Sequence, residues 1–224
     1  MQYRNRTRQT GFTLVEIAIV LVIIGLLLGG VLKGQEMIEN AKVKNVISDM
    51  RGVTAAYNSY VDRFRRLPGD DGPNVAALTP RGGSWVNITA AGNNTGVLQI
   101  TPAQIFTGAG EAAAFWQHLR ASGFIAGNPA DAGAVAIPRN AFNGLMGVGN
   151  NTTAITGMAQ GLSICLGQVP GKAARQIDTQ IDDGNPATGV IRSTQGVAGT
   201  NTTPAAGSLI PYSEDQQYTV CSTL

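Results

Sequence analysis

A single acidic residue in an apolar run near the start of the chain is the first feature that could do chemistry. Glu16 is the only charged residue among the 21 residues from 12 to 32. An ionised carboxylate in hydrocarbon costs several kcal/mol, about 2.5 to 3.5 on insertion scales, so it requires a partner or a function. The run itself contains no cation. If the chain were cut after Gly11, the new α-amino group of Phe12 would supply that charge at the right end of the helix.

The rest of the chain offers few residues for catalysis. The single histidine, His118, lies in an alanine-rich segment beside Trp116. A satisfied or exposed structural histidine is expected there rather than a general base. Asp70 and Asp71 follow a Pro-Gly pair, which favours turn and capping chemistry. No catalytic residue is predicted, and the protein is not expected to be an enzyme.

A second group of acids forms the candidate metal site. Asp178 and Asp182 are one helical turn apart, and Asp183 and Asn185 follow in the next turn. This oxygen-rich corner could hold Ca²⁺, which prefers oxygen ligands. The EF-hand spacing is absent, however, and a simple Asp-Gly turn is the alternative. No other cofactor is expected.

The element that must position Glu16 is a membrane helix. At about 1.5 Å per residue, the 21 residues of the run 12–32 cross a hydrocarbon core of roughly 30 Å. The upstream flank holds Arg4, Arg6 and Arg8 without an acid, whereas the downstream flank mixes Lys33 with two glutamates. This asymmetry places the N-terminus in the cytoplasm. A secretory signal peptide would have a shorter apolar core and a small-residue cleavage site beyond it, so a plain signal anchor is the alternative.

An amphipathic helical pattern continues from the apolar run without a break. Apolar residues recur at three- and four-residue steps, so one helix of about 55 residues is expected from Phe12 to Arg66. Leu67-Pro68-Gly69 should end this helix, because proline cannot continue the hydrogen-bond ladder. Residues 12–33 are expected to be embedded in lipid, and residues 34–66 are expected to lie on a globular head.

The head, residues 67–224, is rich in Gly, Ala, Asn and Thr, so its core should be small. The predicted helices are Glu111–Arg120, with Gly123 as the stop signal, and 170–181; the predicted strands are 134–137, 162–166, 189–193 and 218–221. A long helix packed on a head of short helices and antiparallel strands gives an α+β fold.

The run Gly11-Phe12-Thr13-Leu14-Val15-Glu16-Ile17 resembles the class III signal of type IV pilins and type II secretion pseudopilins. The resemblance implies that residues 1–11 are a leader, cut off by prepilin peptidase on the cytoplasmic side after Gly11. It implies that the new N-terminus at Phe12 is methylated. It also implies that Glu16 meets the N-terminal amine of a neighbouring subunit during assembly.

The resemblance covers residues 1–66 well and the remainder only in layout. The implied partners are prepilin peptidase, the inner membrane before assembly, other pilins in a filament, and the pilus or secretion machinery. The precursor would be a single-pass inner-membrane protein with a periplasmic head. After assembly, the protein would belong to an extracellular pilus or a periplasmic pseudopilus.

The preferred interpretation is a structural subunit of a type IV pilus, either a major or a minor pilin. A pseudopilin is the alternative. Lys33 stands where many major pilins carry a helix-kinking proline, which favours a pseudopilin or a minor pilin. An alternative of another class is a bitopic, membrane-anchored periplasmic binding protein. Adhesion, motility, DNA uptake and secretion are not separable from these residues.

Two cysteines, Cys165 and Cys221, lie beyond the membrane run and therefore in an oxidising periplasm. They allow one intramolecular pair, and a disulfide between them is predicted, worth roughly 3 to 5 kcal/mol by the chain-entropy model. A cysteine pair near the C-terminus also resembles the disulfide-bounded region of many type IV pilins. Two free thiols or a metal pair are the alternatives, but one histidine and no C-x-x-C motif leave too few ligands.

The charge balance excludes one class of partner. The precursor has 16 basic and 14 acidic residues, and loss of the leader arginines leaves 13 basic residues against 14 acidic ones. General nucleic-acid binding needs a basic patch or stripe, so it is not predicted. Arg63, Arg65 and Arg66 form the main local cluster, where a solvated helix end that complements the helix dipole is expected.

Overall fold

The computed structural model describes residues 13–150, 155, 158, 161–205 and 211–224. Gly11, Phe12 and the rest of the expected leader lie outside these described residues. The chain falls into two compact units, Met1–Ala41 and Lys42–Leu224. The boundaries predicted at 33/34 and 66/67 remain predictions.

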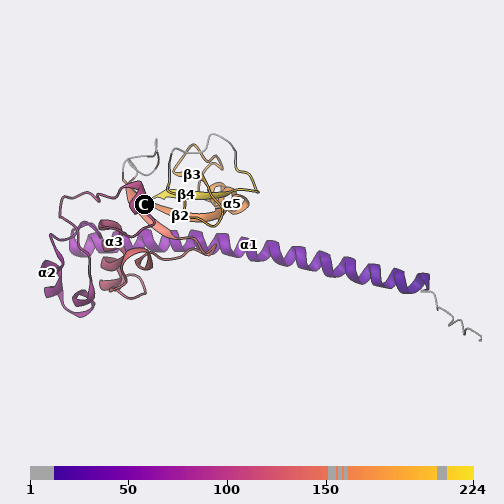
Figure 1. Ribbon diagram of the computed structural model, residues 1–224, viewed down its shortest axis with the longest axis horizontal. Helices are drawn as coiled ribbons and strands as arrows, with labels where there is room; N and C mark the ends of the chain where they lie inside the picture. Colours follow the sequence, from indigo (N-terminus) through magenta and orange to yellow (C-terminus); the bar gives the residue numbers. More distant parts are fainter. Residues whose placement is uncertain (1–12, 151–154, 156–157, 159–160, 206–210) are drawn as a thin grey trace, which may run out of the picture. The chain divides into compact units, whose positions relative to one another are not determined.

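The first helix, α1, spans Leu14–Phe64 and passes through both units (Figure 1). It ends two residues before the predicted Arg66, because Arg65 adopts the left-handed conformation with φ 54°. The N–H of Arg65 still bonds the carbonyl of Val61, so the residue closes the last turn as a helix C-terminal position does. The sequence therefore places the stop of this helix correctly to within two residues.

Within the second unit, one face of α1 forms a wall of the hydrophobic core. The buried side chains on this face are Val43, Val46, Ile47, Met50, Val53, Ala56 and Tyr60. Their three- and four-residue spacing is the helical period that the sequence displays. The rings of Tyr57 and Tyr60 lie beside Phe115 and His118 of the helix α3, Glu111–Ala121.

The other helices of the second unit are short. They are α2 (Val75–Leu78) and α5 (Gly171–Ile181), with the 3-10 helices η1 (Thr79–Arg81), η2 (Gly83–Asn87), η3 (Pro102–Gln104) and η4 (Gly133–Ala136). Both predicted helices, at 111–120 and 170–181, are confirmed. Gly123, the predicted stop signal, follows α3 with φ 80°. Glycine adopts this left-handed conformation without strain because it has no Cβ.

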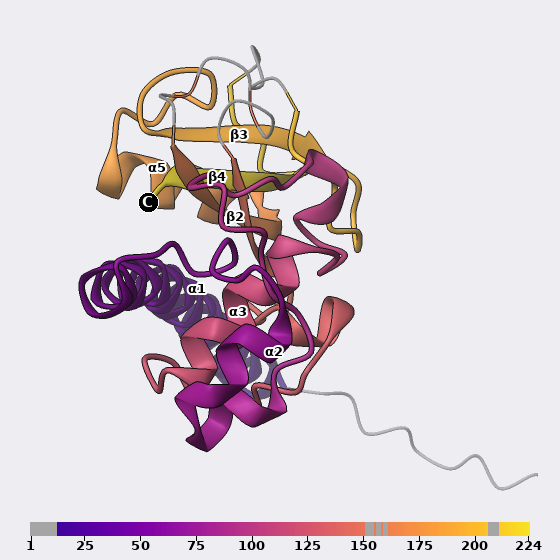
Figure 2. The ribbon, with the colours of Figure 1, turned by 90° about the vertical axis from the view of Figure 1, so that its left-hand side faces the viewer.

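Four antiparallel strands form one sheet in the order β1-β2-β4-β3. They are β1 (Met146–Asn150), β2 (Leu162–Pro170), β3 (Ile191–Gly196) and β4 (Gln217–Thr223). Figure 2 shows α5 beside this sheet, and its apolar residues Ala173, Ala174 and Ile177 are fully buried. The predicted α+β class is confirmed.

Three of the predicted strands are confirmed, at β2, β3 and β4. The strand predicted at 134–137 is wrong, because Gly133–Ala136 forms the 3-10 helix η4. Gly133 takes φ 59° and its carbonyl lies against Gly108, where an added Cβ would approach within 2.0 Å. This close packing of two backbones imposes a turn on a run that is too short to specify a strand by itself.

Strand β1 was not predicted, because its two glycines lower the strand propensity of the segment. The structure gives the reason for one of them. A Cβ at Gly147 would lie 2.3 Å from the carbonyl oxygen of Ile105, so the strand can pass that backbone only with glycine.

The predicted disulfide between Cys165 and Cys221 is confirmed. The two residues are direct partners in the β2–β4 ladder, with Cα atoms 4.0 Å apart, and both are fully buried. The bond spans 56 residues of sequence, for which the chain-entropy model gives roughly 4 kcal/mol. It therefore fastens β4 and the C-terminal end of the chain to the centre of the sheet.

Candidate functional site

Glu16 and Thr13 form a capping box at the start of α1. The backbone N–H and the hydroxyl of Thr13 both donate to Glu16 Oε2 at 2.8 Å. In return, Thr13 Oγ1 accepts the backbone N–H of Glu16 at 3.3 Å. The Thr-Leu-Val-Glu spacing is the sequence signature of this motif, so the signal was present but its role as a cap was missed.

The capping box turns the Glu16 carboxylate back toward the beginning of the helix. The positive end of the helix dipole lies there, which favours a negative charge. Thr13 directly follows Phe12 in the sequence, so the carboxylate is bonded to the residue next to the expected new N-terminus. In the described part of the chain, the second oxygen, Oε1, accepts no hydrogen bond.

The helix around Glu16 exposes its apolar side chains on every side. Leu14 is 90% exposed, Leu26 is 74% exposed, and every apolar residue between them is also exposed. Among the described residues, α1 is the helix that is long and apolar enough to cross a membrane. This surface needs lipid or other helices to cover it, because burying each such side chain contributes about 1.5 to 3 kcal/mol.

His118 is a structural residue, as its contacts show. Its Nδ1 accepts the backbone N–H of Gly69 at 3.0 Å, so Nε2 carries the proton and lies 3.3 Å from the carbonyl of Ala90. Burial lowers the pKa of His118 to about 4. The negative charge of Asp71 opposes this decrease, and the positive charge of Arg81 contributes to it. Both ring nitrogens serve the fold, which leaves neither for acid–base catalysis.

The pair Asp70 and Asp71 does lie in a turn, as predicted, but it does more than cap. Asp71 receives two hydrogen bonds from the Arg81 guanidinium, at 2.8 and 3.2 Å, and one from the Tyr60 hydroxyl at 2.7 Å. Asp70 accepts the backbone N–H groups of Thr95 and Gly96. Nothing local in the sequence signals these long-range partners.

Arg81 also lies against two aromatic rings, which contact each other edge to face. Its guanidinium carbon lies 4.7 Å from the centre of the Phe64 ring and 4.6 Å from the Trp85 ring. This stacking adds cation–π attraction to the ion pair with Asp71. The three elements α1, η1 and η2 are thus fastened together at the end of the long helix.

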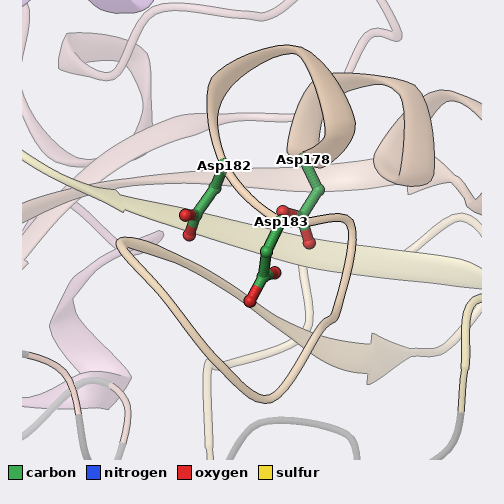
Figure 3. Close-up of side chains that lie close together, drawn as sticks. All are labelled: Asp178, Asp182 and Asp183. Carbon is green, nitrogen blue, oxygen red and sulfur yellow. The ribbon is translucent and has the colours of Figure 1, made fainter.

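The three acids of the predicted cation site do lie together at the end of α5 (Figure 3). Asp178, Asp182 and Asp183 each offer a carboxylate oxygen, and these oxygens lie within 4.8 Å of one another. Asp178 is buried, whereas Asp183 is exposed. The pKa of Asp178 is raised, mainly by burial and also by the negative charges of Asp183 and Asp182. Hydrogen bonds from Tyr212 and Gly184 oppose this rise.

Hydrogen-bond donors from the protein already occupy most of these oxygens. Asp178 Oδ1 accepts the N–H of Gly184 at 3.0 Å, and Oδ2 accepts the hydroxyl of Tyr212 at 2.6 Å. Asp182 Oδ2 accepts the backbone N–H of Ile191 at 3.1 Å and that of Val190 at 2.5 Å.

Asp183 completes this pattern with its own two donors. Its oxygens accept the Asn185 N–H at 2.8 Å and the Thr188 hydroxyl at 2.5 Å. These bonds lower the pKa of Asp183. Ca²⁺ takes six to eight oxygen ligands, so binding here would require several of these donors to be displaced. The arrangement fits an Asp-Gly turn better than a calcium site.

Comparison with known proteins gives one match. Residues 6–32 match the family model described as the prokaryotic N-terminal methylation motif. This is the class III prepilin signal of type IV pilins and pseudopilins, as the resemblance indicated. No curated protein and no solved structure matches the chain.

The motif supports a type IV pilin-like or pseudopilin protein, a structural class that is not known as enzymatic. It implies processing by prepilin peptidase and assembly with other pilins. Together, the motif and the apolar helix α1 indicate a membrane-anchored protein.

The buried histidine predicts a loss of stability in acid. Between pH 6.5 and 4 the unfolded chain binds a proton at His118 and the folded chain does not, so stability is present above this window and falls as pH falls through it. Urea unfolding of the full chain in detergent at pH 7 and pH 4.5 should show a contribution of about 2 to 3 kcal/mol from this residue.

His118→Gln is the matched variant, because glutamine does not titrate. Between pH 7 and pH 4.5, the free energy of unfolding of the variant should fall by about 2 to 3 kcal/mol less than that of the wild type. The pKa values of Asp178 and Glu111 are raised mainly by burial, and both acids are present in both proteins. Their contributions to the pH dependence of stability therefore cancel when the two proteins are compared. Equal pH dependence in the two proteins would contradict the account.

We propose that the head folds without a cation at the acidic corner. Thermal unfolding of the full chain should give the same midpoint in EDTA and in excess Ca²⁺. If the corner did bind Ca²⁺, a free ion concentration of about 100 times the Kd would raise the free energy of unfolding by about 2.7 kcal/mol, and the midpoint would rise. A midpoint that rises in Ca²⁺ but not in Mg²⁺, with the rise abolished by Asp182→Asn, would show that the corner is a calcium site.

Proposed function

We propose that this protein is a structural subunit of a type IV pilus, either a major or a minor pilin. In this proposal prepilin peptidase cuts the chain after Gly11, the amine of Phe12 is methylated, and the mature chain joins a helical filament. The observation that carries the proposal is the prepilin motif at 6–32, which leads directly into a long apolar helix with Glu16 at its start.

The exposed apolar surface of α1 explains both locations of the proposed subunit. Before assembly, the inner membrane covers these side chains, with the N-terminus in the cytoplasm and the head in the periplasm. In the filament, the same segments of neighbouring subunits cover one another. The head would then face outward in an extracellular pilus, or in a periplasmic pseudopilus under the alternative.

Glu16 provides the electrostatic part of assembly in this proposal. Its Oε2 holds the start of the helix through Thr13, and its Oε1 is available to the amine of a neighbouring subunit. A carboxylate that meets an amine at the same depth no longer has the cost of an isolated charge in an apolar environment. The pair would therefore fix the position of each incoming subunit.

A type II secretion pseudopilin is the second candidate. Lys33 favours it, because α1 continues through this position, where many major pilins carry a proline. The disulfide near the C-terminus favours a pilin, since many pseudopilins lack one. The other class of alternative, a membrane-anchored binding protein, would retain its leader.

The state of the N-terminus tests the proposal directly. Intact-mass analysis of the protein purified from its native host should give a chain that begins at Phe12 and carries one added methyl group. The measurement needs no variant, and the same spectrum reports whether the disulfide is formed. A mature protein that still carries residues 1–11 would contradict processing and would favour the binding-protein alternative.

Glu16→Ala separates processing from assembly. The variant should still be cut after Gly11, because the cleavage site is intact, but filament recovery by shearing should fall by about tenfold or more for loss of a charge pair in an apolar environment. Glu36→Ala is the control, since Glu36 is an exposed acid of the same helix paired with Lys33. Normal filament yield from Glu16→Ala would remove the charge-pairing account.

A further inference from the structure

Two grooves flank the exposed face of α1 within the unit Lys42–Leu224. The Asp49 groove, of about 520 Å³, lies between α1 and the segment that follows α3; on α1 it is lined by Ser48, Asp49, Gly52 and Val53. The Lys44 groove, of about 260 Å³, lies between α1 and the end of α5. It is lined by Lys44, Ile47, Ser48, Arg51 and Gln180. Ser48 lines both, so the two grooves share one ridge.

The charged residues of the two grooves point to opposite sides of the helix. At about 100° per residue, Asp49 is turned by about 140° from Lys44 and by about 160° the shorter way from Arg51. In the described part of the chain, none of these three side chains has an ion-pair partner or a hydrogen bond. Among the described residues, the head therefore carries an acid without an ion-pair partner, Asp49, on one flank of α1. It carries two bases without such a partner, Lys44 and Arg51, on the other flank.

The Asp49 carboxylate has no ion pair within the described part of the chain. Partial burial raises the pKa of Asp49. Arg139 lines the same groove and keeps its positive charge, but its guanidinium donates to the carbonyl of Asn143 at 2.8 Å and forms no ion pair with Asp49. Phe124 and Ile125 form an apolar part of the groove wall, against which the stem of a lysine or arginine can pack.

The ridge between the grooves is made of small and short polar side chains. Its exposed residues, spaced three or four apart, are Asn45, Ser48, Gly52, Ala55 and Ser59. A Cβ added at Gly52 would meet nothing within 4 Å. The ridge therefore offers no bulky side chain that would hold another copy of the chain at a distance.

We propose that the Asp49 groove of one copy receives Lys44 and Arg51 of a second copy of this chain. The inference rests on the proposed function as a filament subunit and names the head surfaces that meet. Charge complementarity selects the occupant, because the chain itself carries the required bases on the opposite flank of the same helix. A symmetric pairing of two Lys44 grooves would instead bring like charges together, because Lys44 and Arg51 are the charged residues of that groove.

The contact has the form that an open filament requires. Two different patches meet, so each copy leaves one flank free for the next, and the array does not close as a two-fold dimer. Asp49 is five residues from Lys44 and two residues from Arg51 in sequence, so either pairing would displace the two helices along their axes by about 3 to 8 Å. The contact thus complements the one proposed for Glu16 at the helix start.

Charge reversal in the full chain tests the contact in the native host. Asp49→Lys, and separately Lys44→Glu with Arg51→Glu, should each reduce filament yield by about tenfold or more, because like charges then face each other across the interface. All three changes together should restore the yield. Asp62→Lys is the control, since Asp62 is an 81% exposed acid on α1 outside both grooves.

Crosslinking reports the geometry without relying on yield. Gly52→Cys in the Asp49 groove with Gln180→Cys in the Lys44 groove leaves all three charges in place. Treated on intact filaments with a short bismaleimide, this variant should give a ladder of multimers, because each copy links to the next. Asn58→Cys with Gly52→Cys is the matched pair outside the Lys44 groove and should give little crosslinking. A product that stops at the dimer would contradict the heterologous contact.

The two proposals fail in distinguishable ways. Wild-type protein that is neither cut nor assembled would contradict the filament function itself. Wild-type filaments whose yield is unchanged by either charge reversal, with no ladder from the cysteine pair, would overturn only the flank contact. Loss of yield in both reversals without recovery in the combined variant would also overturn the pairing.

Discussion

An apolar helix that carries one carboxylate sets the main physical constraint on this protein. The side chains from Leu14 to Leu32 have no cover within the described chain, and Glu16 has only the cap formed with Thr13. Lipid can cover the aliphatic surface but cannot neutralise the charge. Under the proposed function, processing and assembly would answer both requirements, since cleavage would create an amine and neighbouring helices would replace the lipid. The prepilin motif and the energetic problem therefore point to the same class of protein.

The head is built on the second part of the same helix. Val43 to Tyr60 supply one wall of its core, and α3, buried along its whole length, lies beside them. At the end of α1 the pair Asp71–Arg81, with Tyr60 beneath it, fastens the chain where it leaves the helix. The disulfide fastens the opposite end of the sequence into the sheet. With both ends held, the head can present fixed flanks on either side of α1, as a repeating contact requires.

Polar residues that resemble functional sites form hydrogen bonds within the head. His118, Asp70 and Asp71 are buried and fully engaged with backbone groups or with Arg81. The acids at the end of α5 accept hydrogen bonds from the turn that they organise. By contrast, Asp49, Lys44 and Arg51, which have no ion-pair partner in the described part of the chain, lie on the exposed sides of α1. Function in this chain is therefore expected at its outer surfaces and its helix start rather than in an enclosed site.

The sequence by itself determined the long helix, its stop near Pro68, the helices around Phe115 and Ile177, and the strands that carry the cysteines. These features are local, because hydrophobic period, proline and glycine act over a few residues. The sequence also identified Glu16, because one charge in an apolar run stands out without any structural information. Only the tertiary structure decided that Gly133–Ala136 is a 3-10 helix, that Gly147 permits a strand, and that Asp71 meets Arg81. Those outcomes depend on backbones and side chains that approach from distant parts of the chain, and no local pattern records such contacts.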